Sequence, residues 1–274
     1  MSTSQSEKAK RFRTLHQGPG AFVIANAWDA GSAMIMAGLG FEAVATSSGA
    51  FAGTLGRSDG AVTRQEALDH ARAVAAAVAV PVSADLENGF GPTPEAAAET
   101  VRLAAATGLV GCSIEDWAGN AERRLYDPNE AAERIAAAVE AARKTDFDFT
   151  LTARAENFLR GNPDLDDTIR RLQSYEAAGA DVLMAPGLPD LAAIEAVCSA
   201  VAKPVNFMIG IPGKSFAKAE LEKAGVRRIS LATSLYKAAL GGLIGAAREA
   251  KDKGTFTYVD GLMPTSELNS LLGN

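Results

Sequence analysis

Residues 82–91 read Val-Ser-Ala-Asp-Leu-Glu-Asn-Gly-Phe-Gly, an apolar strand that runs directly into two carboxylates and a glycine-rich turn. If the strand continued through residue 87, its alternation would send Asp85 and Glu87 to the same side. Two like charges side by side are costly unless a cation or protons neutralise them. Oxygen donors without a neighbouring histidine or cysteine suit a hard ion such as Mg2+ better than zinc. For this segment alone, a strand followed by a solvated acidic turn is the alternative interpretation.

The strand in this segment belongs to a unit that repeats along the chain. In four places a helical stretch ends at a glycine and an apolar strand follows, around residues 36–46, 104–114, 177–184 and 223–231. Glycine just past a helix end supplies the left-handed cap that turns the chain back toward a sheet. Pro81 and Pro204 mark the starts of two more strands. Eight strands are expected in all, near residues 22–26, 41–46, 82–86, 110–115, 149–154, 181–185, 205–209 and 228–232.

Alanine-rich amphipathic helices are expected between these strands, near residues 30–38, 64–79, 94–106, 129–144, 165–178, 189–201, 215–224 and 234–252. The strands are short and almost continuously apolar, as in a parallel sheet buried on both faces. Eight alternating units predict an α/β fold, a closed (β/α)8 TIM barrel. A Rossmann-like sheet is the alternative, but residues 26–29 read Asn-Ala-Trp-Asp where its Gly-x-Gly-x-x-Gly would stand.

Composition agrees with one large globular domain. The chain has 274 residues, of which 47% are hydrophobic and 22% charged, and a barrel of this length forms a single domain. A net charge of -6 without a basic stripe argues against a nucleic-acid partner. Residues 1–17 hold no apolar run typical of a signal peptide, and the Ala/Val run at 73–82 is too short to span a membrane.

The chain has two cysteines, Cys112 and Cys198, and both stand in apolar contexts. We expect buried free thiols rather than a disulfide, which fits a reducing compartment. The sequence therefore predicts a cytoplasmic protein with no membrane partner.

In a barrel, functional residues gather where the strands end at their carboxyl termini. Three of the expected strand ends are acidic, and the end of the fifth strand adds an arginine. Together they predict a Mg2+ site with a basic group for a substrate anion, although a helix cap or loop residue is the alternative at any single end. The polar residues at the strand ends are Asn26, Trp28, Asp29, Thr46, Ser47, Ser48, Gly49, Asp85, Glu87, Glu115, Asp116, Arg154, Glu156, Asn206, Thr233 and Ser234.

These residues resemble the isocitrate lyase and phosphoenolpyruvate mutase superfamily, including its phosphonomutase-like and 2-methylisocitrate lyase-like members. The matching pieces occur in the family's order from about residue 20 to 240: Asn26-Ala-Trp-Asp, Thr46-Ser-Ser-Gly, Leu55-Gly-Arg-Ser-Asp-Gly, Asp85-Leu-Glu-Asn-Gly-Phe-Gly, Ile114-Glu-Asp and Ala153-Arg-Ala-Glu-Asn-Phe. The resemblance implies a barrel enzyme that binds Mg2+, or Mn2+ in its place, and acts on small 2-oxo or 2-hydroxy carboxylates.

The resemblance also implies roles for single residues. Asp85 corresponds to the direct metal ligand, and Glu87 and Glu115 to carboxylates that hold the metal's waters. Asp59 corresponds to an aspartate on a loop beside the substrate. The backbone amides of Ser48 and Gly49, with Ser47, would bind the substrate carboxylate, and Arg154 would pair with its other charged end. The candidate catalytic residues are Asp59, Glu115 and Arg154; the substrate-binding candidates are Ser47, Ser48, Gly49, Asp59, Arg154 and Asn206; the metal-ligand candidates are Asp85, Glu87 and Glu115.

The segment at residues 117–126 departs from the family pattern. It reads Trp-Ala-Gly-Asn-Ala-Glu-Arg-Arg-Leu-Tyr, whereas lyases that cleave isocitrate or methylisocitrate carry Lys-Lys/Arg-Cys-Gly-His there. In those lyases the cysteine protonates the product. The Lys-x-x-Pro-Lys pattern of the mutases is absent as well. The substrate and the proton donor therefore stay open.

Several reactions share the chemistry that such a site supports. Retro-aldol cleavage, decarboxylation of oxaloacetate-like acids and P–C bond chemistry all pass through pyruvate-like enolates that Mg2+ stabilises. We favour a Mg2+-dependent C–C lyase. The alternatives are a mutase or hydrolase of P–C bonds, an oxaloacetate-type decarboxylase, and a non-catalytic barrel that senses a dicarboxylate.

The barrel is expected to occupy residues 1–254, with a helical extension at 255–274. In that extension Thr265 and Ser266 precede Glu267 as in a helix cap, and Leu268, Leu271 and Leu272 then share one face. This face packs either on its own barrel or on another subunit. Family members exchange a C-terminal helix between paired subunits, so the resemblance implies a homotetramer, a dimer of helix-swapped dimers.

Overall fold

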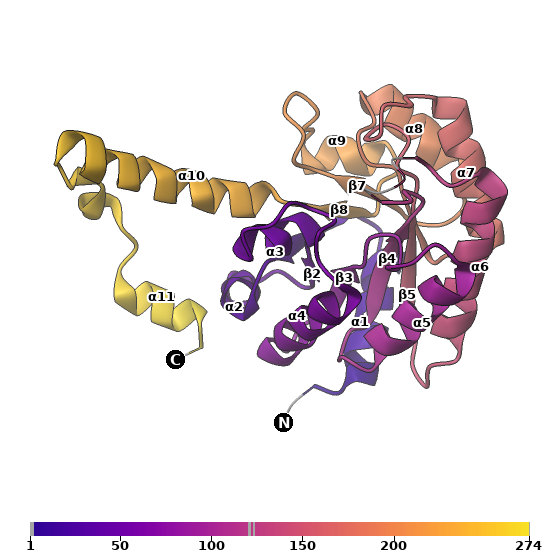
Figure 1. Cartoon of the computed structure of the whole chain (residues 1–274), viewed down its shortest axis with the longest axis horizontal. Helices are drawn as coiled ribbons and strands as arrows, with labels where there is room; N and C mark the ends of the chain where they lie inside the picture. The colour runs from indigo at the N-terminus through magenta and orange to yellow at the C-terminus, as the bar shows by residue number, and fades with distance from the viewer. Residues whose placement is uncertain (1–2, 120–121, 123, 274) are drawn as a thin grey trace.

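The computed structural model describes residues 3–119, 122 and 124–273. Its sheet is a closed barrel in which each strand pairs in parallel with the next and β8 pairs with β1 (Figure 1). The (β/α)8 prediction is confirmed, and the Rossmann-like alternative is wrong. The strands are β1 Phe22–Ala27, β2 Val44–Thr46, β3 Val82–Asp85, β4 Gly111–Glu115, β5 Thr150–Arg154, β6 Val182–Met184, β7 Val205–Met208 and β8 Arg228–Ser230.

A ring of helices covers the outer face of the barrel. Capping side chains start several of them: Thr93 and Asp127 accept backbone N–H groups, each just before a proline in the first turn. Alanines on the inner helix faces pack against the outward side chains of the strands and form the main core. The helices that follow the strands are α2 Ala30–Gly38, α4 Arg64–Ala77, α5 Pro94–Ala105, α6 Pro128–Arg143, α7 Leu165–Ala177, α8 Leu191–Ala200, α9 Lys218–Lys223 and α10 Ser234–Arg248.

Two helices were not expected from the sequence. The polar segment at the N-terminus forms α1, Gln5–Gln17, whose Ala9 and Phe12 are fully buried against Phe22 and Ile24 of β1. Its narrow apolar side was hidden by the polar residues around it. The second helix, α3 Ser48–Thr54, follows β2 directly and begins at Ser47, which caps it.

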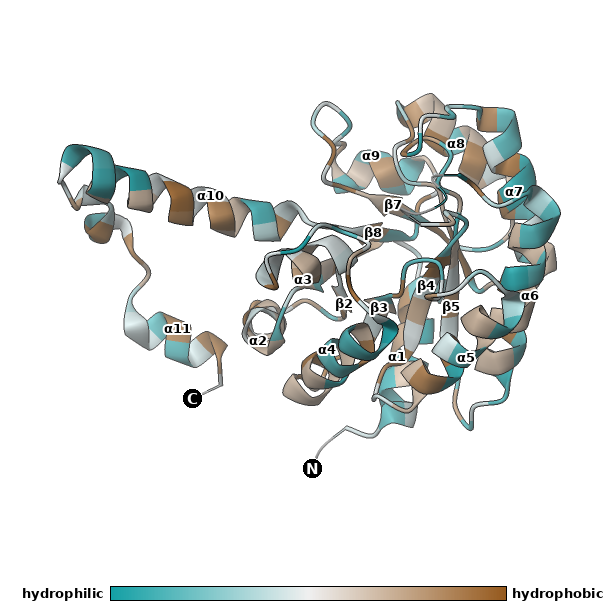
Figure 2. Cartoon of the chain, in the orientation of Figure 1, coloured by the Kyte–Doolittle hydropathy of each residue, from teal (hydrophilic) through white to brown (hydrophobic). Residues whose placement is uncertain are grey.

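The C-terminal segment leaves the barrel. Helix α10 projects away from it (Figure 1), and none of its residues is buried. A π-helical turn Glu249–Lys253, a 3-10 turn Thr257–Gly261 and helix α11 Thr265–Leu271 follow. Figure 2 shows hydrophobic residues, in brown, along this arm. Its large exposed apolar residues are Leu243, Ile244, Phe256, Tyr258, Val259, Leu262, Met263 and Leu268.

Helix α11 returns toward its own barrel and lies against α2. A Cβ added at Gly38 of α2 would come within 2.6 Å of the Leu271 carbonyl oxygen, so the two backbones are in close contact. The apolar face of the extension is thus partly covered by its own chain, whereas α10 contacts the barrel at its start, through Leu235 and Tyr236, and Leu243 and Ile244 further along it are exposed.

Both cysteines are free thiols, as expected, but only Cys112 is buried; Cys198 is half-buried. Among the described residues, no helix has the length and apolar character needed to cross a membrane.

Candidate active site

The predicted site residues gather around two adjoining cavities at the carboxyl ends of the strands. The larger, about 200 Å³, is lined by residues that include Ser47, Gly49, Asp85 and Arg228. The smaller, about 80 Å³, is lined by Glu87, Glu115 and Trp117 among others. The two cavities share three lining residues, Ser48, Asp59 and Arg154. Every candidate site residue except Asn206 lines one of them.

Asp85 is the last residue of β3 and is held by hydroxyl groups on both neighbouring strand ends. Its carboxylate accepts hydrogen bonds from Ser48 at 2.9 Å and from Ser113 at 3.4 Å. Its backbone N–H donates to the Thr46 hydroxyl at 3.1 Å. These contacts fix one carboxylate at the point where the two cavities meet.

Glu87 reaches the site through a turn and not through strand alternation. The strand ends at Asp85, and Glu87 has a left-handed backbone with φ 49°. The turn continues through Gly89 at φ 85°, where a Cβ would lie 2.9 Å from Ala97 Cα. The Glu87 carbonyl accepts the Glu115 N–H at 2.9 Å, which keeps these two residues side by side.

Burial and mutual repulsion raise the pKa values of the carboxyl groups in the site. Burial, followed by the charges of Asp85 and Asp59, raises the pKa of Glu87 to about 8. Burial and then Asp85 raise the pKa of Asp59, and burial and then Glu156 raise that of Glu115. A group of acids in this state gains stability from an added cation.

Two arginines form ion pairs with the carboxylates of the site. Arg154, at the end of β5, lies 3.7 Å from Asp85 and 3.4 Å from Glu115, and it also pairs with Glu156. Arg160 lies 2.9 Å from Glu156 and 3.5 Å from Glu115. The Arg160 guanidinium also stacks 4.5 Å from the centre of the Trp117 ring.

The sequence analysis did not identify Arg160. The available signal was its spacing of four residues from Glu156 in a segment that directly follows an active-site strand. That spacing is equally common on the surface of helices, so only the closed barrel places Arg160 over the site.

The donor chemistry of the site fits a hard divalent cation. In the described part of the chain, four carboxylates line the cavities together with three guanidinium groups, those of Arg154, Arg160 and Arg228. The four acids are Asp59, Asp85, Glu87 and Glu115, and Glu156 pairs with two of the arginines, so acids outnumber arginines. No three acidic, histidine or cysteine side chains among the described residues converge closely enough to hold an ion; Arg154 pairs with both Asp85 and Glu115.

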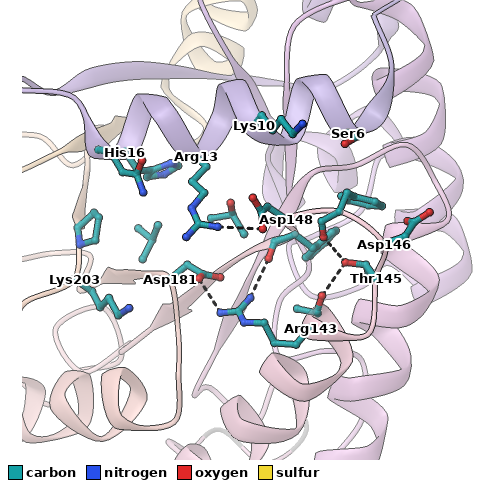
Figure 3. A pocket seen from close by; sticks show the side chains of 17 residues that line it. Ser6, Lys10, Arg13, His16, Arg143, Thr145, Asp146, Asp148, Asp181 and Lys203 are labelled. Carbon is teal, nitrogen blue, oxygen red and sulfur yellow. Dashed lines mark hydrogen bonds and ion pairs between the residues drawn. The ribbon is translucent and has the colours of Figure 1, made fainter.

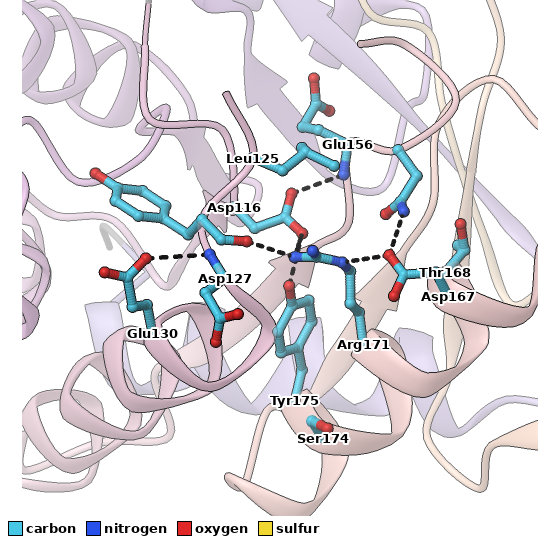
Figure 4. Close-up of polar contacts among 12 residues, drawn as sticks. Asp116, Leu125, Asp127, Glu130, Glu156, Asp167, Thr168, Arg171, Ser174 and Tyr175 are labelled. Atoms are coloured by element: carbon cyan, nitrogen blue, oxygen red, sulfur yellow. Dashed lines mark hydrogen bonds and ion pairs between the residues drawn. The ribbon is translucent and has the colours of Figure 1, made fainter. Parts of the chain in front are cut away.

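A buried network beneath the site holds the ends of β4 and β5 together (Figure 4). Asp116 accepts hydrogen bonds from the Glu156 N–H at 2.8 Å, from Arg171 at 3.1 Å and from the Tyr175 hydroxyl at 2.7 Å. Arg171 also donates to the Tyr126 carbonyl at 2.9 Å. Asp116 is therefore a structural residue that positions its neighbours.

Three of the substrate-binding candidates lie at the start of α3. The Ser47 hydroxyl accepts the Ala50 N–H at 3.3 Å and so caps the helix. Ser48 and Gly49 form the first turn, where backbone amides lack helical partners. A Cβ at Gly49 would lie 3.2 Å from the Asp59 carboxyl carbon, so the absence of a side chain lets Asp59 approach.

Asn206 occupies a different place from the other candidates. It is 1% exposed, and its amide donates to the Ser230 hydroxyl at 3.0 Å. Its oxygen accepts from Arg228 Nε at 3.0 Å. Asn206 is absent from the lining of both described cavities, and it is linked to the larger cavity through Arg228 and Ser230, which line it.

The segment at 117–126 is described in part, because residues 120, 121 and 123 lie outside the described residues. Ala118 N–H donates to the Arg124 carbonyl at 2.9 Å, which joins the two ends of the segment. Trp117 lines the smaller cavity. The Tyr126 ring packs 4.3 Å from the Arg134 guanidinium and is buried, so Tyr126 has a packing role.

A larger cavity, about 810 Å³, lies at the opposite end of the barrel, between α1 and the starts of β5, β6 and β7 (Figure 3). Much of its charge is paired: Arg13 lies 3.0 Å from Asp148, and Arg143 lies 2.7 Å from Asp181. Residues at this end of a barrel mainly serve stability. We therefore assign the candidate active site to the smaller cavities.

The fold and these cavities define an α/β-barrel with an acidic site at the carboxyl ends of its strands. The chain belongs to the phosphoenolpyruvate phosphomutase family, whose model matches residues 12–251. It is an enzyme of the isocitrate lyase and phosphoenolpyruvate mutase superfamily, as the resemblance implied. The non-catalytic sensor barrel is accordingly set aside.

Three similar proteins illustrate the range of the superfamily. The 2-methylisocitrate lyase of Escherichia coli (strain K12) is 31% identical over 249 residues, which cover 87% of this chain and 82% of that protein. The oxaloacetate decarboxylase of Bradyrhizobium diazoefficiens is 31% identical over 205 residues, covering 72% and 69%. A crystal structure from Burkholderia cenocepacia J2315, described only as a lyase/mutase, is 50% identical with a TM-score of 0.96 and covers 98% of each chain.

Proposed function

We propose that this protein is a Mg2+-dependent lyase that cleaves a C–C bond of a small 2-hydroxy or 2-oxo carboxylate or dicarboxylate through an enolate. The observation that carries the proposal is the pairing of the two arginines nearest the carboxylates. Arg154 and Arg160 are both neutralised by Glu115 and by Glu156, which is fully buried. The acidic cavity is therefore suited to a metal cation and a carboxylate substrate.

P–C bond chemistry is the less favoured reaction. A mutase or hydrolase must stabilise a phosphoryl group in transit, which takes several cationic groups aimed at its oxygens. Arg154 and Arg160 share Glu115 and Glu156. The larger cavity is also lined by the apolar side chains of Leu159, Met184 and Met208, which suit the carbon skeleton of an organic acid.

Asp85, Glu87 and Glu115 would hold the metal, Asp85 directly and the two glutamates through water. Bound there, Mg2+ or Mn2+ would supply positive charge that stabilises an enolate. The backbone amides of Ser48 and Gly49, beside Ser47, would bind the substrate carboxylate. Arg154 would orient its other charged end, with Glu115 holding the guanidinium in place.

Asp59 is the candidate for proton transfer. It lies beside Gly49 and lines both cavities. Because burial and Asp85 raise its pKa, its carboxylate is a stronger base than an exposed aspartate and would accept the proton of a substrate hydroxyl. The described part of segment 117–126 supplies no cysteine or histidine to return a proton to the product.

Oxaloacetate-type decarboxylation is the second candidate, favoured by the similarity to the Bradyrhizobium decarboxylase. Product analysis separates the reactions. The protein is incubated with Mg2+ and a panel of 2-hydroxy and 2-oxo diacids, and the products are followed by proton NMR. A lyase releases two carbon fragments such as pyruvate and glyoxylate, whereas a decarboxylase releases CO2 with one oxo acid. Phosphonopyruvate, followed by phosphorus NMR, tests the P–C alternative. If no acid of the panel is cleaved into two organic fragments, the lyase proposal is contradicted.

The proposed assembly is a homotetramer made of helix-swapped dimers. The support for it is the arm itself: α10 buries no residue, and six large apolar side chains between residues 243 and 263 are exposed, together with Tyr258. Exposed apolar area of this kind marks an interaction surface. A second copy of the chain would cover it.

A further inference from the structure

The interior of the barrel contains a third arginine, Arg228, at the start of β8. It is 4% exposed and lies inside the strand ring, below the carboxylates of the candidate site. A guanidinium this deep carries a large desolvation cost and normally has a carboxylate partner. Burial lowers the pKa of Arg228 to about 10, with the charge of Asp85 opposing the shift. The side chain is therefore a cation at neutral pH.

The partners of Arg228 are all neutral. Nε donates to Asn206 Oδ1 at 3.0 Å, and Nη1 donates to the Thr152 hydroxyl at 3.1 Å. Within the described part of the chain Arg228 forms no ion pair, in contrast to Arg154 and Arg160. Asn206 in turn donates to Ser230. The guanidinium is thus oriented by amide and hydroxyl groups, and no carboxylate of the described residues is in direct contact with it.

The same arginine lines the floor of the larger cavity. This cavity of about 200 Å³ reaches from Ser48, Gly49 and Arg154 down to Arg228 and Ser230. Nη2 forms no hydrogen bond with the described residues, and it is not among the fully buried polar atoms that lack a partner. The Nη2 group of this charged guanidinium, which its other two nitrogens hold in place, is therefore accessible from the cavity.

We propose that Arg228, oriented by Asn206 and Thr152, forms an anion-binding subsite at the floor of the active-site cavity. It receives the carboxylate of the substrate that is remote from the reacting bond. The inference rests on the proposed function for its choice of ligand and deepens it: of the small organic acids, the site selects dicarboxylates. A carboxylate at this position supplies the direct ion-pair partner that Arg228 does not have among the described residues. Asn206 is then a positioning residue that acts through Arg228.

The test compares acids that differ only in a terminal carboxylate. Malate is paired with 2-hydroxybutyrate, and 2-hydroxyglutarate with 2-hydroxypentanoate, and each is titrated into the full-length protein with Mg2+ by calorimetry. We expect the wild-type protein to bind the diacid of at least one pair about tenfold or more tightly, as a charge-assisted hydrogen bond gives. Arg228→Gln should remove this preference by weakening the diacid, with the monoacid within about twofold of its wild-type affinity.

The matched control is the neighbouring arginine. Arg227 is half-buried. Burial raises the pKa of the Cys198 thiol of α8, and Arg227 lies close enough to oppose that rise, so it faces the helix layer. Arg227→Gln makes the same chemical change and should keep the diacid preference. Arg228→Lys keeps the charge without the fork and should keep part of the preference, which allows the test if Arg228→Gln does not fold.

Three results would overturn the subsite: equal binding of diacid and monoacid by the wild type at both lengths, an unchanged preference in folded Arg228→Gln, or an equal loss in Arg227→Gln. These readouts measure binding and are separate from turnover. A diacid preference that depends on Arg228 without C–C cleavage would refute the lyase proposal and support the subsite. C–C cleavage together with an unchanged diacid preference in Arg228→Gln would support the lyase proposal and refute the subsite.

Discussion

The guanidinium of Arg154 lies 3.4 Å from the Glu115 carboxylate and 3.7 Å from that of Asp85. Arg154 therefore occupies the position between two proposed metal-holding acids. A cation that binds there competes with the arginine for the same oxygens, so metal binding and the position of Arg154 are coupled. A substrate carboxylate on Arg154 would ease this competition, since it gives the arginine a further negatively charged partner.

The first prediction concerns the metal. Chelation should abolish turnover, and added Mg2+ should restore it. Asp85→Ala should lower kcat by about a thousandfold or more, and Glu87→Ala by less, because Asp85 is the proposed direct ligand. The control is Glu140→Ala, which removes an exposed carboxylate paired with Lys144 at 2.7 Å. Full activity of Asp85→Ala in the presence of chelator would refute the assignment.

The second prediction follows from the competition for carboxylates. Arg154→Gln should abolish turnover yet bind Mn2+ about tenfold more tightly, because a neutral side chain no longer opposes a cation beside Glu115 and Asp85. Mn2+ affinity is measured by electron paramagnetic resonance without substrate. Arg143→Gln, which breaks a surface pair, should leave the affinity unchanged. Weaker Mn2+ binding in Arg154→Gln would show that the arginine supports the metal site.

The third prediction tests the network beneath the site. Tyr175→Phe removes one donor to buried Asp116 without a change in ring volume. The free energy of unfolding should fall by about 1–3 kcal/mol, the usual cost of an unsatisfied buried acceptor. Urea unfolding measures the loss. Tyr258→Phe removes the hydroxyl of an exposed tyrosine and should change stability little; equal effects of the two substitutions would contradict the role of the network.

The fourth prediction is a pH dependence of stability. Burial, followed by the charge of Arg228, lowers the pKa of His16 to about 3. Between that value and about 6.5 the unfolded chain binds the proton and the folded chain does not, so the contribution of His16 to stability falls as pH drops below about 6.5. Between pH 7 and 5 the loss attributable to His16 should be up to about 2 kcal/mol.

Urea unfolding of the wild type and of His16→Gln at pH 7 and pH 5 isolates this contribution. The net wild-type slope does not, because the raised pKa of Glu87 favours the folded state on acidification while burial lowers the pKa of His70 and acts in the same direction as His16. On acidification the wild type should therefore lose more stability, or gain less, than His16→Gln. An equal change in the two proteins would contradict a neutral buried His16.

The fifth prediction concerns the C-terminal arm. Deletion of residues 255–274 should yield smaller or aggregated particles by light scattering, since it removes much of the proposed interface. Phe256→Ser with Leu262→Ser should weaken assembly in the same direction without shortening the chain. An unchanged particle mass after deletion, or a full-length monomer at micromolar concentration, would refute the tetramer.

The sequence by itself determined the eight-unit barrel and the acidic character of its site. Strand and helix positions follow from local signals: buried strands are continuously apolar, helices are capped at residues such as Thr93 and Asp127, and glycines end them. Because parallel strands all end at one rim, residues as distant as Asp85 and Arg154 had to meet. The motif from Asp85 to Gly91 therefore located the site before any tertiary contact was known.

Tertiary structure alone decided which charges are paired. The sequence does not show which of Arg154, Arg160 and Arg228 forms an ion pair. In the structure the first two have carboxylate partners, and Arg228 has none among the described residues. The place of Glu87 also depended on a left-handed turn, and that of α1 on a narrow apolar side closing the barrel. Pairing depends on a few ångströms between segments distant in the chain, whereas helix and strand periodicity are local. The chain's own pattern could therefore predict the rim and its acids, but not the cation at the floor of the cavity.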